Sequence, residues 1–478
     1  MLNATQLMAL PVDWHGKFGL QSTMINDYRR LTATSEVSAS NDGSQEVKLS
    51  SGNKDSLSFQ SYIFKLSPDI IINDSATMHA EFSTGYANGG FLGDSATTAK
   101  SGSLQNGSPA LYAQNRAGSN GLNVQKVFLE LNSDTATYHI GRHTYHWGLG
   151  ALYNEGSQAL DRHAYSRDGV TMFFKFNNFH ITPFWSVPSI VGTNSQPNLT
   201  RSADAKDYGL SFLYDNKDKD IAMGVQYSIK NSGAFNGVYV SNVETANTYM
   251  GKSQIKVLDL YFKKIFGNFD FSIEAPLISG DLGHLVNNSS TATANSKAIL
   301  FQSNYVHSDS LSFGFDMGYV SGQDSDKSKF KASYLNPNFQ IANLLFKYNL
   351  NAVGDSSQNI YDSYLTNTQY FKVRAKYLSD KWTLDGAIIV ANALEAATSG
   401  QVAFNHQKMK FFNATKTQEK NLGTEFDFNA SYKWNKEVSL VGSLGYLMTG
   451  KYFAYTNTAS DNTVKNSLSL EGGIVLDF

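Results

Sequence analysis

The stretch that decides the fold is Glu425-Phe426-Asp427-Phe428-Asn429-Ala430-Ser431-Tyr432-Lys433-Trp434. Its apolar residues occupy the even-numbered positions and its polar residues the odd-numbered ones. A period of two with this contrast is typical of a β-strand that has one apolar face and one face in contact with water. The stretch therefore predicts a two-faced strand.

The sequence that follows predicts a hairpin and a last strand. Asn435 and Lys436 form a predicted tight turn, and residues 438–448 alternate again. A longer polar link at 450–465 leads to a final alternating segment that ends at Phe478. The end of the chain thus predicts strand, short turn, strand, long link, strand.

The same hairpin recurs upstream, each time around a short link that is mostly rich in Asn, Asp, Gly or Ser, which is hairpin chemistry. The paired segments are 57–66 with 77–86, 124–131 with 135–141, 169–176 with 180–187, 208–214 with 221–229, 254–266 with 269–275, 297–306 with 311–320, and 369–378 with 382–390. An opening strand at 14–25 brings the expected total to about eighteen.

The links between these hairpins are long and rich in Ser, Gly, Asn and Thr, notably 87–121, 192–205, 231–253 and 280–295. Short turns that alternate with long links, around an even number of strands, are typical of an outer-membrane barrel. We therefore expect an all-β, transmembrane, antiparallel up-and-down β-barrel that occupies residues 1–478 as a single domain, with both termini periplasmic. A soluble β-propeller is the main alternative, but it requires a recurring blade motif, and we find none.

Composition supports a membrane barrel. Aromatic residues make up 13% of the chain, and there are 38 Gly against 8 Pro, which favours strands. We find no stretch near the roughly 20 apolar residues that a membrane helix needs. The formal net charge is −2, which is unlike the basic surface of a nucleic-acid-binding protein. There is no Cys, which suits an oxidising compartment. The first ten residues lack the features of a signal peptide, so we expect mature numbering.

The final octad, Glu471-Gly472-Gly473-Ile474-Val475-Leu476-Asp477-Phe478, has Gly at its third position and apolar residues at its sixth and eighth. It resembles the insertion signal that barrel-assembly machinery reads on a last strand, with Gly473, Leu476 and Phe478 in the key places. We therefore expect the assembly machinery, outer-membrane lipid and lipopolysaccharide as partners.

Two segments resemble the alginate-export family of outer-membrane porins. One is Asn421-Leu422-Gly423-Thr424-Glu425-Phe426-Asp427-Phe428 with the later Tyr432-Lys433, Gly445-Tyr446 and Gly450-Lys451-Tyr452-Phe453; the other is Gly141-Arg142 with Trp147-Gly148-Leu149-Gly150. The resemblance implies an eighteen-stranded barrel with a charged lumen that passes an anionic polysaccharide. It carries Glu425 and Asp427 over as lumen-facing residues.

Strand phase assigns the charged residues that face the lumen. On 369–378 the apolar residues take one face, so Lys372, Arg374 and Lys376 form a basic row on the other. The further lumen-facing candidates for solute selectivity are Lys175, Asp259, Lys263, Glu425, Asp427 and Lys433. These charges indicate either a cation-lined track for an anionic solute or ion pairs that fill and stiffen the barrel.

The segment 139–167 is rich in His and Arg. Arg142, His143, Arg162 and Arg167 are candidates for an inward-folded constriction loop. The alternative is an ordinary rim, with Tyr145 and Trp147 in the aromatic girdle. His139 and His143 share a strand face but lie about 13 Å apart along an extended strand, so we expect no metal site.

These features together predict a passive pore of the bacterial outer membrane for polar or anionic solutes, including an exported polysaccharide. The alternative is a barrel plugged by its own loops that anchors a periplasmic or surface partner protein. We find no signature of a nucleophile elbow or a metalloprotease, so we expect neither an enzyme nor a cofactor.

Overall fold

The computed structural model describes residues 10–27, 56–84, 90–92, 122–189, 205–232, 253–283, 291–349, 359–457, 461 and 464–478. Nineteen strands form one sheet; all but the two-residue β14 (Lys329–Phe330) make up the wall, which leaves eighteen. The wall strands are β1 (Val12–Asn26), β2 (Ser56–Asn73), β3 (Ala76–Thr84), β4 (Asn123–Asn132), β5 (Ala136–Thr144), β6 (Ser166–Phe176), β7 (Phe179–Ser189), β8 (Ala205–Asn216), β9 (Ile221–Ser232), β10 (Ser253–Phe266), β11 (Phe269–Gly283), β12 (Ala292–Ser308), β13 (Leu311–Val320), β15 (Thr368–Leu378), β16 (Trp382–Ala393), β19 (Asn421–Lys433), β20 (Val438–Thr449) and β21 (Ser467–Asp477).

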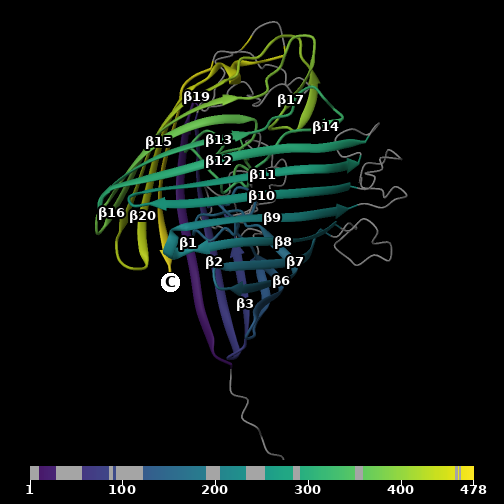
Figure 1. Ribbon diagram of the computed structural model, residues 1–478. Coiled ribbons are helices and arrows are strands. Elements are labelled where there is room, and N and C mark those ends of the chain that lie inside the picture. The colour runs from purple at the N-terminus through teal and green to yellow at the C-terminus, as the bar shows by residue number, and fades with distance from the viewer. Residues whose placement is uncertain are drawn as a thin grey trace, which may run out of the picture.

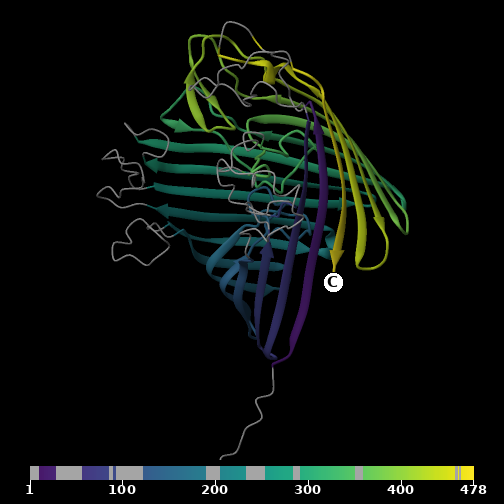
Figure 2. The ribbon, with the colours of Figure 1, turned by 180° about the vertical axis from the view of Figure 1, so that it is seen from behind.

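The wall closes on itself. Each wall strand pairs antiparallel with the next, and β21 pairs with β1 from Lys17 opposite Asp477 to Asn26 opposite Leu468. Figures 1 and 2 show the last strand, in yellow, beside the first, in purple. The predicted eighteen-stranded antiparallel barrel is therefore confirmed.

The eight short turns lie at one end of the barrel, which we call the short-turn end; the long links lie at the other, the long-link end. Asn177 has φ +49° and Gly267 has φ +56°, as tight hairpin turns require. β1 begins and β21 ends at the short-turn end. That this end faces the periplasm stays a prediction.

Two predicted links are in part strand. β2 continues through Pro68 to Asn73, so the link before β3 is Asp74-Ser75 instead of the predicted ten residues. β11 and β12 likewise extend into the predicted link 280–295. A polar, Gly-rich sequence predicts a loop. The prediction failed here because strands can stay paired beyond the membrane-facing part of a barrel, where no apolar residues are needed. Most of the predicted links 87–121, 192–205 and 231–253 lie outside the described residues.

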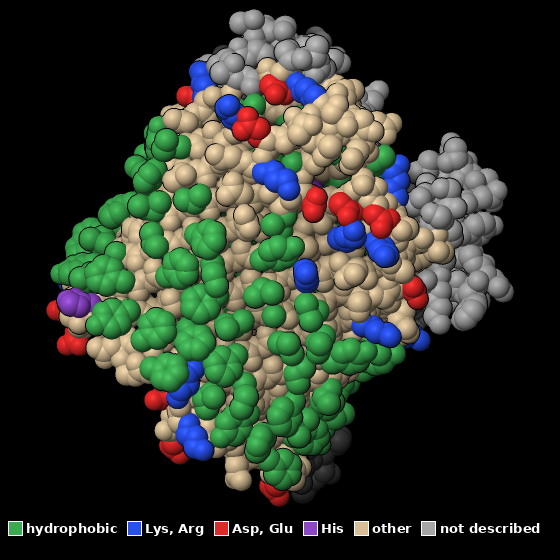
Figure 3. Space-filling model, turned by 45° about the horizontal axis from the view of Figure 1, so that its top comes forward, with side chains coloured by type: hydrophobic (Ala, Val, Ile, Leu, Met, Phe, Trp, Pro, Cys, Tyr) green, Lys and Arg blue, Asp and Glu red, His purple; other side chains and the backbone are tan. Residues whose placement is uncertain are grey.

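The outer face of the wall is an apolar belt. Alternate side chains on β15 are exposed, with Phe371 at 51% and Val373 at 50%, while Tyr370, which precedes them on the opposite face of the strand, is buried. Figure 3 shows apolar side chains spread over the wall and charged ones gathered near the barrel's ends. A closed barrel that presents such a belt is an integral outer-membrane protein, because a barrel satisfies its backbone groups within lipid.

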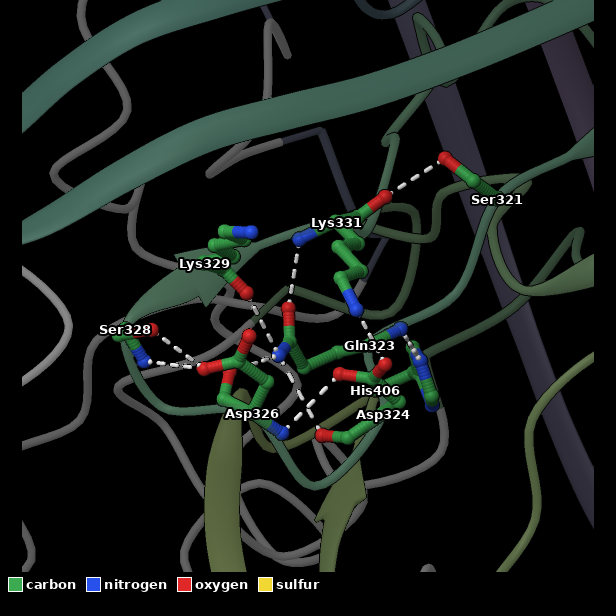
Figure 4. Close-up of polar contacts among 8 residues, drawn as sticks. All are labelled: Ser321, Gln323, Asp324, Asp326, Ser328, Lys329, Lys331 and His406. Atoms are coloured by element: carbon green, nitrogen blue, oxygen red, sulfur yellow. Dashed lines mark hydrogen bonds and ion pairs between the residues drawn. The ribbon is translucent and has the colours of Figure 1, made fainter.

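The links at the long-link end carry short elements of their own. β17 (Val402–Asn405) and β18 (Lys410–Asn413) form a hairpin in the link before β19, and the 3-10 helix η6 (Lys451–Ala454) lies in the link before β21. A second 3-10 helix, η4 (Lys217–Lys219), lies at the short-turn end, between β8 and β9. In the described part of the chain no helix has the length and apolarity to cross a membrane. Figure 4 shows the connection before β14, where Gln323 organises the turn through hydrogen bonds to the carbonyls of Asp326 and Lys329.

The inside of the barrel is not an open tube. Two connections fold into it: the first inner segment, residues 145–165, and the second inner segment, residues 331–349 and 359–367. The largest cluster of buried apolar side chains lies where the second segment meets the wall, and it includes Leu335, Leu344, Leu345, Tyr348, Leu365, Leu300, Ile389 and Leu447. The core of this protein therefore lies within the lumen.

Candidate functional site: the filled lumen

Ring hydroxyls attach the first inner segment to the wall. Tyr145 donates to the side-chain oxygen of Gln226 at 2.8 Å, and Tyr165 donates to Asp207 at 3.0 Å. Trp147 packs over Gly224 of β9, where a Cβ would lie 2.7 Å from the indole ring. Glycine at this inward position of the strand therefore makes room for the ring.

Charged wall residues bind the backbone of the same segment. Lys65 of β2 is buried and donates to the carbonyls of Gly156 and Gln158, both at 2.8 Å. On the opposite wall, Glu274 of β11 accepts from the backbone N–H of Leu149 and, at 3.3 Å, from that of Ala151. Buried charges are stable only when such partners are present, so the wall and the segment depend on each other.

Carboxylates hold the second inner segment in the same way. Glu425 of β19 accepts from the backbone N–H groups of Leu344 at 2.6 Å and Leu345 at 2.8 Å. Asp427 accepts from the N–H of Asn343 at 3.1 Å. Backbone N–H groups of an irregular segment need such partners, because a buried N–H without an acceptor is costly.

Glu471 of β21 joins the second segment to three wall strands. Its carboxylate pairs with Lys347 at 2.7 Å and accepts from the hydroxyl of Tyr348. It also accepts from Ser443 at 3.0 Å and from Gln21. Four donors around one buried carboxylate make it the most heavily bonded wall group that we find in the lumen.

The two segments also contact each other across the lumen. The N–H of Asn336 donates to the carbonyl of Ala151 at 2.7 Å. The His163 ring lies 3.1 Å from the carbonyl of Tyr361, and burial lowers the pKa of this imidazole. The guanidinium of Arg162 lies 3.8 Å from the centre of the Tyr361 ring. We call this contact between the segments the seam.

Two cavities flank the second inner segment. The short-turn cavity, of about 360 Å³, is lined by charged and amide side chains that include Arg162, Lys347, Asp385, Asn429 and Glu471. The long-link cavity, of about 180 Å³, is lined by polar side chains and by aromatic rings that include Tyr334, Phe346, Tyr348, Tyr364 and Tyr452. The contact between Tyr348 and Glu471 separates them, because each residue lines a different cavity.

The predicted basic row on β15 points inward, as its phase required, and two of its members already have partners. Lys372 donates to the carbonyl of Ile341 in the second inner segment at 2.8 Å. Arg374 pairs with Asp316 of β13 at 3.3 Å. Lys376 makes no hydrogen bond or ion pair within the part of the chain that is described. A role of this row in solute selectivity stays a prediction.

The other predicted lumen residues divide by depth. Asp259, Glu425 and Asp427 are buried beneath the inner segments. Lys175, Lys263 and Lys433 lie on the inner phase of their strands toward the short-turn end, where Lys175 and Lys433 are exposed. The structure thus brings the acids together with the inner segments and leaves these lysines near the mouth.

Of the constriction-loop candidates, Arg162 lies within the first inner segment and is 5% exposed, with no hydrogen-bond partner for one terminal nitrogen. Arg167 is buried between the rings of Tyr145 and Phe184, at 3.6 and 3.5 Å. His143 is buried and lies 2.7 Å from the hydroxyl of Thr171. Whether these residues constrict a solute path stays a prediction.

Arg142 corrects the sequence interpretation. It lies on the outer phase of β5 beside exposed Ile140, and it pairs with Asp168 at 2.6 Å. Strand alternation sends it to the opposite face from His143, so it is not part of an inward loop. Tyr145 and Trp147, the predicted girdle residues of the alternative, are instead buried inside the lumen.

The spacing of His139 and His143 is a second correction. Their ring centres lie 5.5 Å apart, much less than the expected separation along the strand. Gly141, between them, has φ +128°, so this part of β5 is not regularly extended. Among the described residues no group of three or more His, Cys, Asp or Glu could hold a metal ion.

The last strand places its signal residues where β21 pairs with β1 and closes the barrel. Phe478 exchanges two backbone hydrogen bonds with Gly16 of β1, at 2.8 and 3.0 Å. A Cβ on Gly473 would lie 2.4 Å from the carbonyl oxygen of Leu20. Recognition of Gly473, Leu476 and Phe478 by assembly machinery stays a prediction.

Sequence reasoning missed the residues that bind the inner segments most directly: Lys65, Glu274, Lys347, Tyr348 and Glu471. The signal was partly present, because Glu471 lies on the inner phase of a strand that was already assigned. Its partners could not be inferred, since they lie more than a hundred residues away in a connection that shows no periodic pattern.

No protein-family model matches the chain, and no curated protein matches it. Solved structures of similar fold include OccK5 (OpdH) of Pseudomonas aeruginosa, which is 10% identical with a TM-score of 0.49 and an alignment over 98% of both chains. A BenF-like porin from Pseudomonas fluorescens Pf-5 is 10% identical with a TM-score of 0.49, over 98% of this chain and 100% of that one. OmpT, an outer membrane protein of Vibrio cholerae, is 11% identical with a TM-score of 0.39, over 99% of both chains.

Proposed function

We propose that this outer-membrane barrel is a channel for the passive passage of polar or anionic solutes. The observation that carries the proposal is the short-turn cavity, which has a buried cation at its inner end. No ion pair joins Arg162 to a carboxylate in the described part of the chain, and one of its terminal nitrogens lacks a partner. A desolvated guanidinium that faces a polar cavity attracts anions more strongly than an exposed one does.

The solute path in this proposal follows the seam between the two inner segments. The second segment is held by the large apolar cluster, whereas the first is held by a smaller cluster of aromatic rings and by hydrogen bonds. Hydrogen bonds can be exchanged for bonds to water at a net cost of about 1 kcal/mol each. The first segment is therefore the one that moves when a solute passes.

Polysaccharide export is the finer form of the proposal. The resemblance of 421–428 to the alginate-export pattern supports it, and it would make the solute an acidic chain that moves past Arg162. Glu425 and Asp427, the matched residues, bind the second segment, so their part in export would be to position that segment.

Single-channel recording in planar bilayers tests the proposal, with ion selectivity taken from the reversal potential in a salt gradient. We expect steady conductance with anion preference, and a shift toward cations in Arg162→Gln. Arg142→Gln is the matched control, because this arginine lies on the outer face and should leave selectivity unchanged. Equal shifts in both variants would remove the basis for assigning selectivity to Arg162.

A loop-plugged barrel that anchors a partner protein is the second candidate. It is favoured by one observation, the buried core of the second segment, in which Leu335 and Leu344 are 0% exposed. A protein that folds and inserts but stays electrically silent under all voltages would support this candidate and exclude the channel.

A further inference from the structure

The long-link cavity has a lining unlike that of the short-turn cavity. Six of its lining residues are aromatic: Tyr334, Phe346, Tyr348, Tyr364, Tyr452 and Phe453. The rest are mainly amides and small polar residues, with one carboxylate, Asp362, and with Met409 and Leu422. Pockets that combine apolar rings with a few fixed polar groups are typical of small-molecule sites.

No basic side chain offsets Asp362 in this lining. Among the described residues that form it there is no Lys or Arg. His406 is buried and accepts a hydrogen bond from the N–H of Gln323 at 2.7 Å (Figure 4), and burial lowers its pKa to about 3. The imidazole is therefore uncharged near neutral pH, and the cavity disfavours anions.

One polar group in the lining lacks a partner. Thr366 is 7% exposed, and its hydroxyl makes no hydrogen bond. A buried hydroxyl without a partner costs about 1–3 kcal/mol. A ligand hydroxyl or N–H group that reaches the Thr366 side chain would recover this energy, whereas a purely apolar ligand would not.

The backbone of the lining is strained at three places. Phe346, Asn367 and Met409 have φ of +65°, +48° and +50°, in the left-handed region that non-glycine residues seldom adopt. They account for three of the six such residues in the described part of the chain. Strain of this kind persists where the surrounding structure enforces it, often at ligand sites.

We propose that the long-link cavity binds a neutral sugar ring. The C–H faces of a sugar are apolar and weakly positive, so they pack against the negative faces of aromatic rings. Its hydroxyls pair with the Thr366 hydroxyl, with amides and with the Asp362 carboxylate. An anionic ligand lacks a counter-charge here. A quaternary ammonium ion would suit the rings and Asp362 but would leave the Thr366 hydroxyl unpaired.

Isothermal titration calorimetry on the detergent-solubilised full chain tests this site. The probes are methyl glucoside and a glucose disaccharide, with gluconate and choline at equal concentrations. We expect saturable binding of the neutral sugars and little heat from the other two. Tighter binding of gluconate or choline, or no sugar binding at all, would overturn the proposal.

Matched variants locate the site. Thr366→Val keeps the side-chain shape and removes the hydroxyl, so we expect about tenfold weaker sugar binding, and Thr366→Ser should restore it. Tyr364→Ala should weaken binding more than Tyr364→Phe. Arg162→Gln in the other cavity should change nothing. Sugar affinity that is the same in Thr366→Val and in the parent protein would place the ligand elsewhere.

The inference rests on the proposed function only in the assumption that the bound sugar is a solute that the channel transports. Calorimetry reports binding without any current, so the two can fail separately. A protein that binds sugar and conducts nothing would retain this site and lose the channel, and a conducting protein that binds no sugar would do the reverse.

Discussion

The two inner segments fill the same lumen but are held by different forces. The second segment buries Leu344 and Leu345 to 0% and 1% exposure against the wall, and the carboxylate of Glu425 accepts hydrogen bonds from their backbone N–H groups. The first segment buries fewer aliphatic side chains, and it is held by a smaller cluster of aromatic rings together with hydrogen bonds from ring hydroxyls and from Lys65. Apolar burial is lost when a segment moves into water, whereas hydrogen bonds are largely replaced. The difference assigns the second segment a fixed role and the first a movable one.

The largest expected effect concerns the fixed segment. Replacing either Leu344 or Leu345 by Ala should destabilise it by about 2–5 kcal/mol, because each is fully buried in a packed cluster. We expect conductance to rise and to become noisy in single-channel recordings. Leu152→Ala in the first segment, which is only partly buried, is the matched control and should act less strongly. Equal effects at the two sites would contradict the claim that the two segments are held by different forces.

A pH effect is expected at the hairpin beside the second segment. The hairpin is the one formed by β17 and β18, and His406 lies in its turn. The pKa of His406 is about 3 in the folded hairpin, below its ordinary 6.5. As the pH falls, the imidazole is therefore protonated first in molecules whose hairpin has opened. Stability of the closed hairpin is therefore full above about pH 6.5 and falls as the pH drops toward 3, by about 1.4 kcal/mol per unit.

Hydrogen exchange measures this effect at the N–H of Gln323, which donates to His406. After correction for the intrinsic rate, its protection should fall about tenfold per pH unit below 6.5. The N–H of Asn336, bonded to a carbonyl, is the internal control. Protection that stays level to pH 4 would show that burial of His406 does not control this hairpin.

A smaller effect is expected at the movable segment. Lys65→Met removes two hydrogen bonds to backbone carbonyls, worth about 1–3 kcal/mol in all, while it keeps most of the side-chain volume. We expect more frequent openings in single-channel recordings and little change in thermal unfolding of the barrel. A large drop in unfolding temperature would mean that the first segment is as much a part of the core as the second.

The barrel could be predicted from the sequence because every wall strand meets two different surroundings. Phe371 and Val373 must face lipid, so the alternation of side chains along the strand was enough to predict that Lys372 and Arg374 point inward. Strand ends were less certain, as β2 shows, since its last residues extend past the alternating stretch.

The binding partners of the inward-facing charged residues could not be predicted in the same way. Lys372 and Glu425 were assigned the correct face, but their partners are backbone groups of a distant connection. Such partners leave no periodic signal, because an irregular segment is positioned by individual hydrogen bonds and not by a repeat. Arg142 was misplaced for a related reason: a charge at a strand end beyond the apolar belt can lie on either face.

One measurement tests the central comparison most directly. The chain has no Cys, so paired cysteines can lock each segment to the wall in turn. Gly19→Cys with Leu160→Cys would tie the first segment to β1, and Asn343→Cys with Gly445→Cys would tie the second to β20, since each glycine lies directly against its partner residue. Single-channel conductance is then recorded under oxidising and reducing conditions. The account predicts that oxidation suppresses conductance reversibly in the first pair and leaves it unchanged in the second. Suppression in the second pair alone, or in neither, would contradict it.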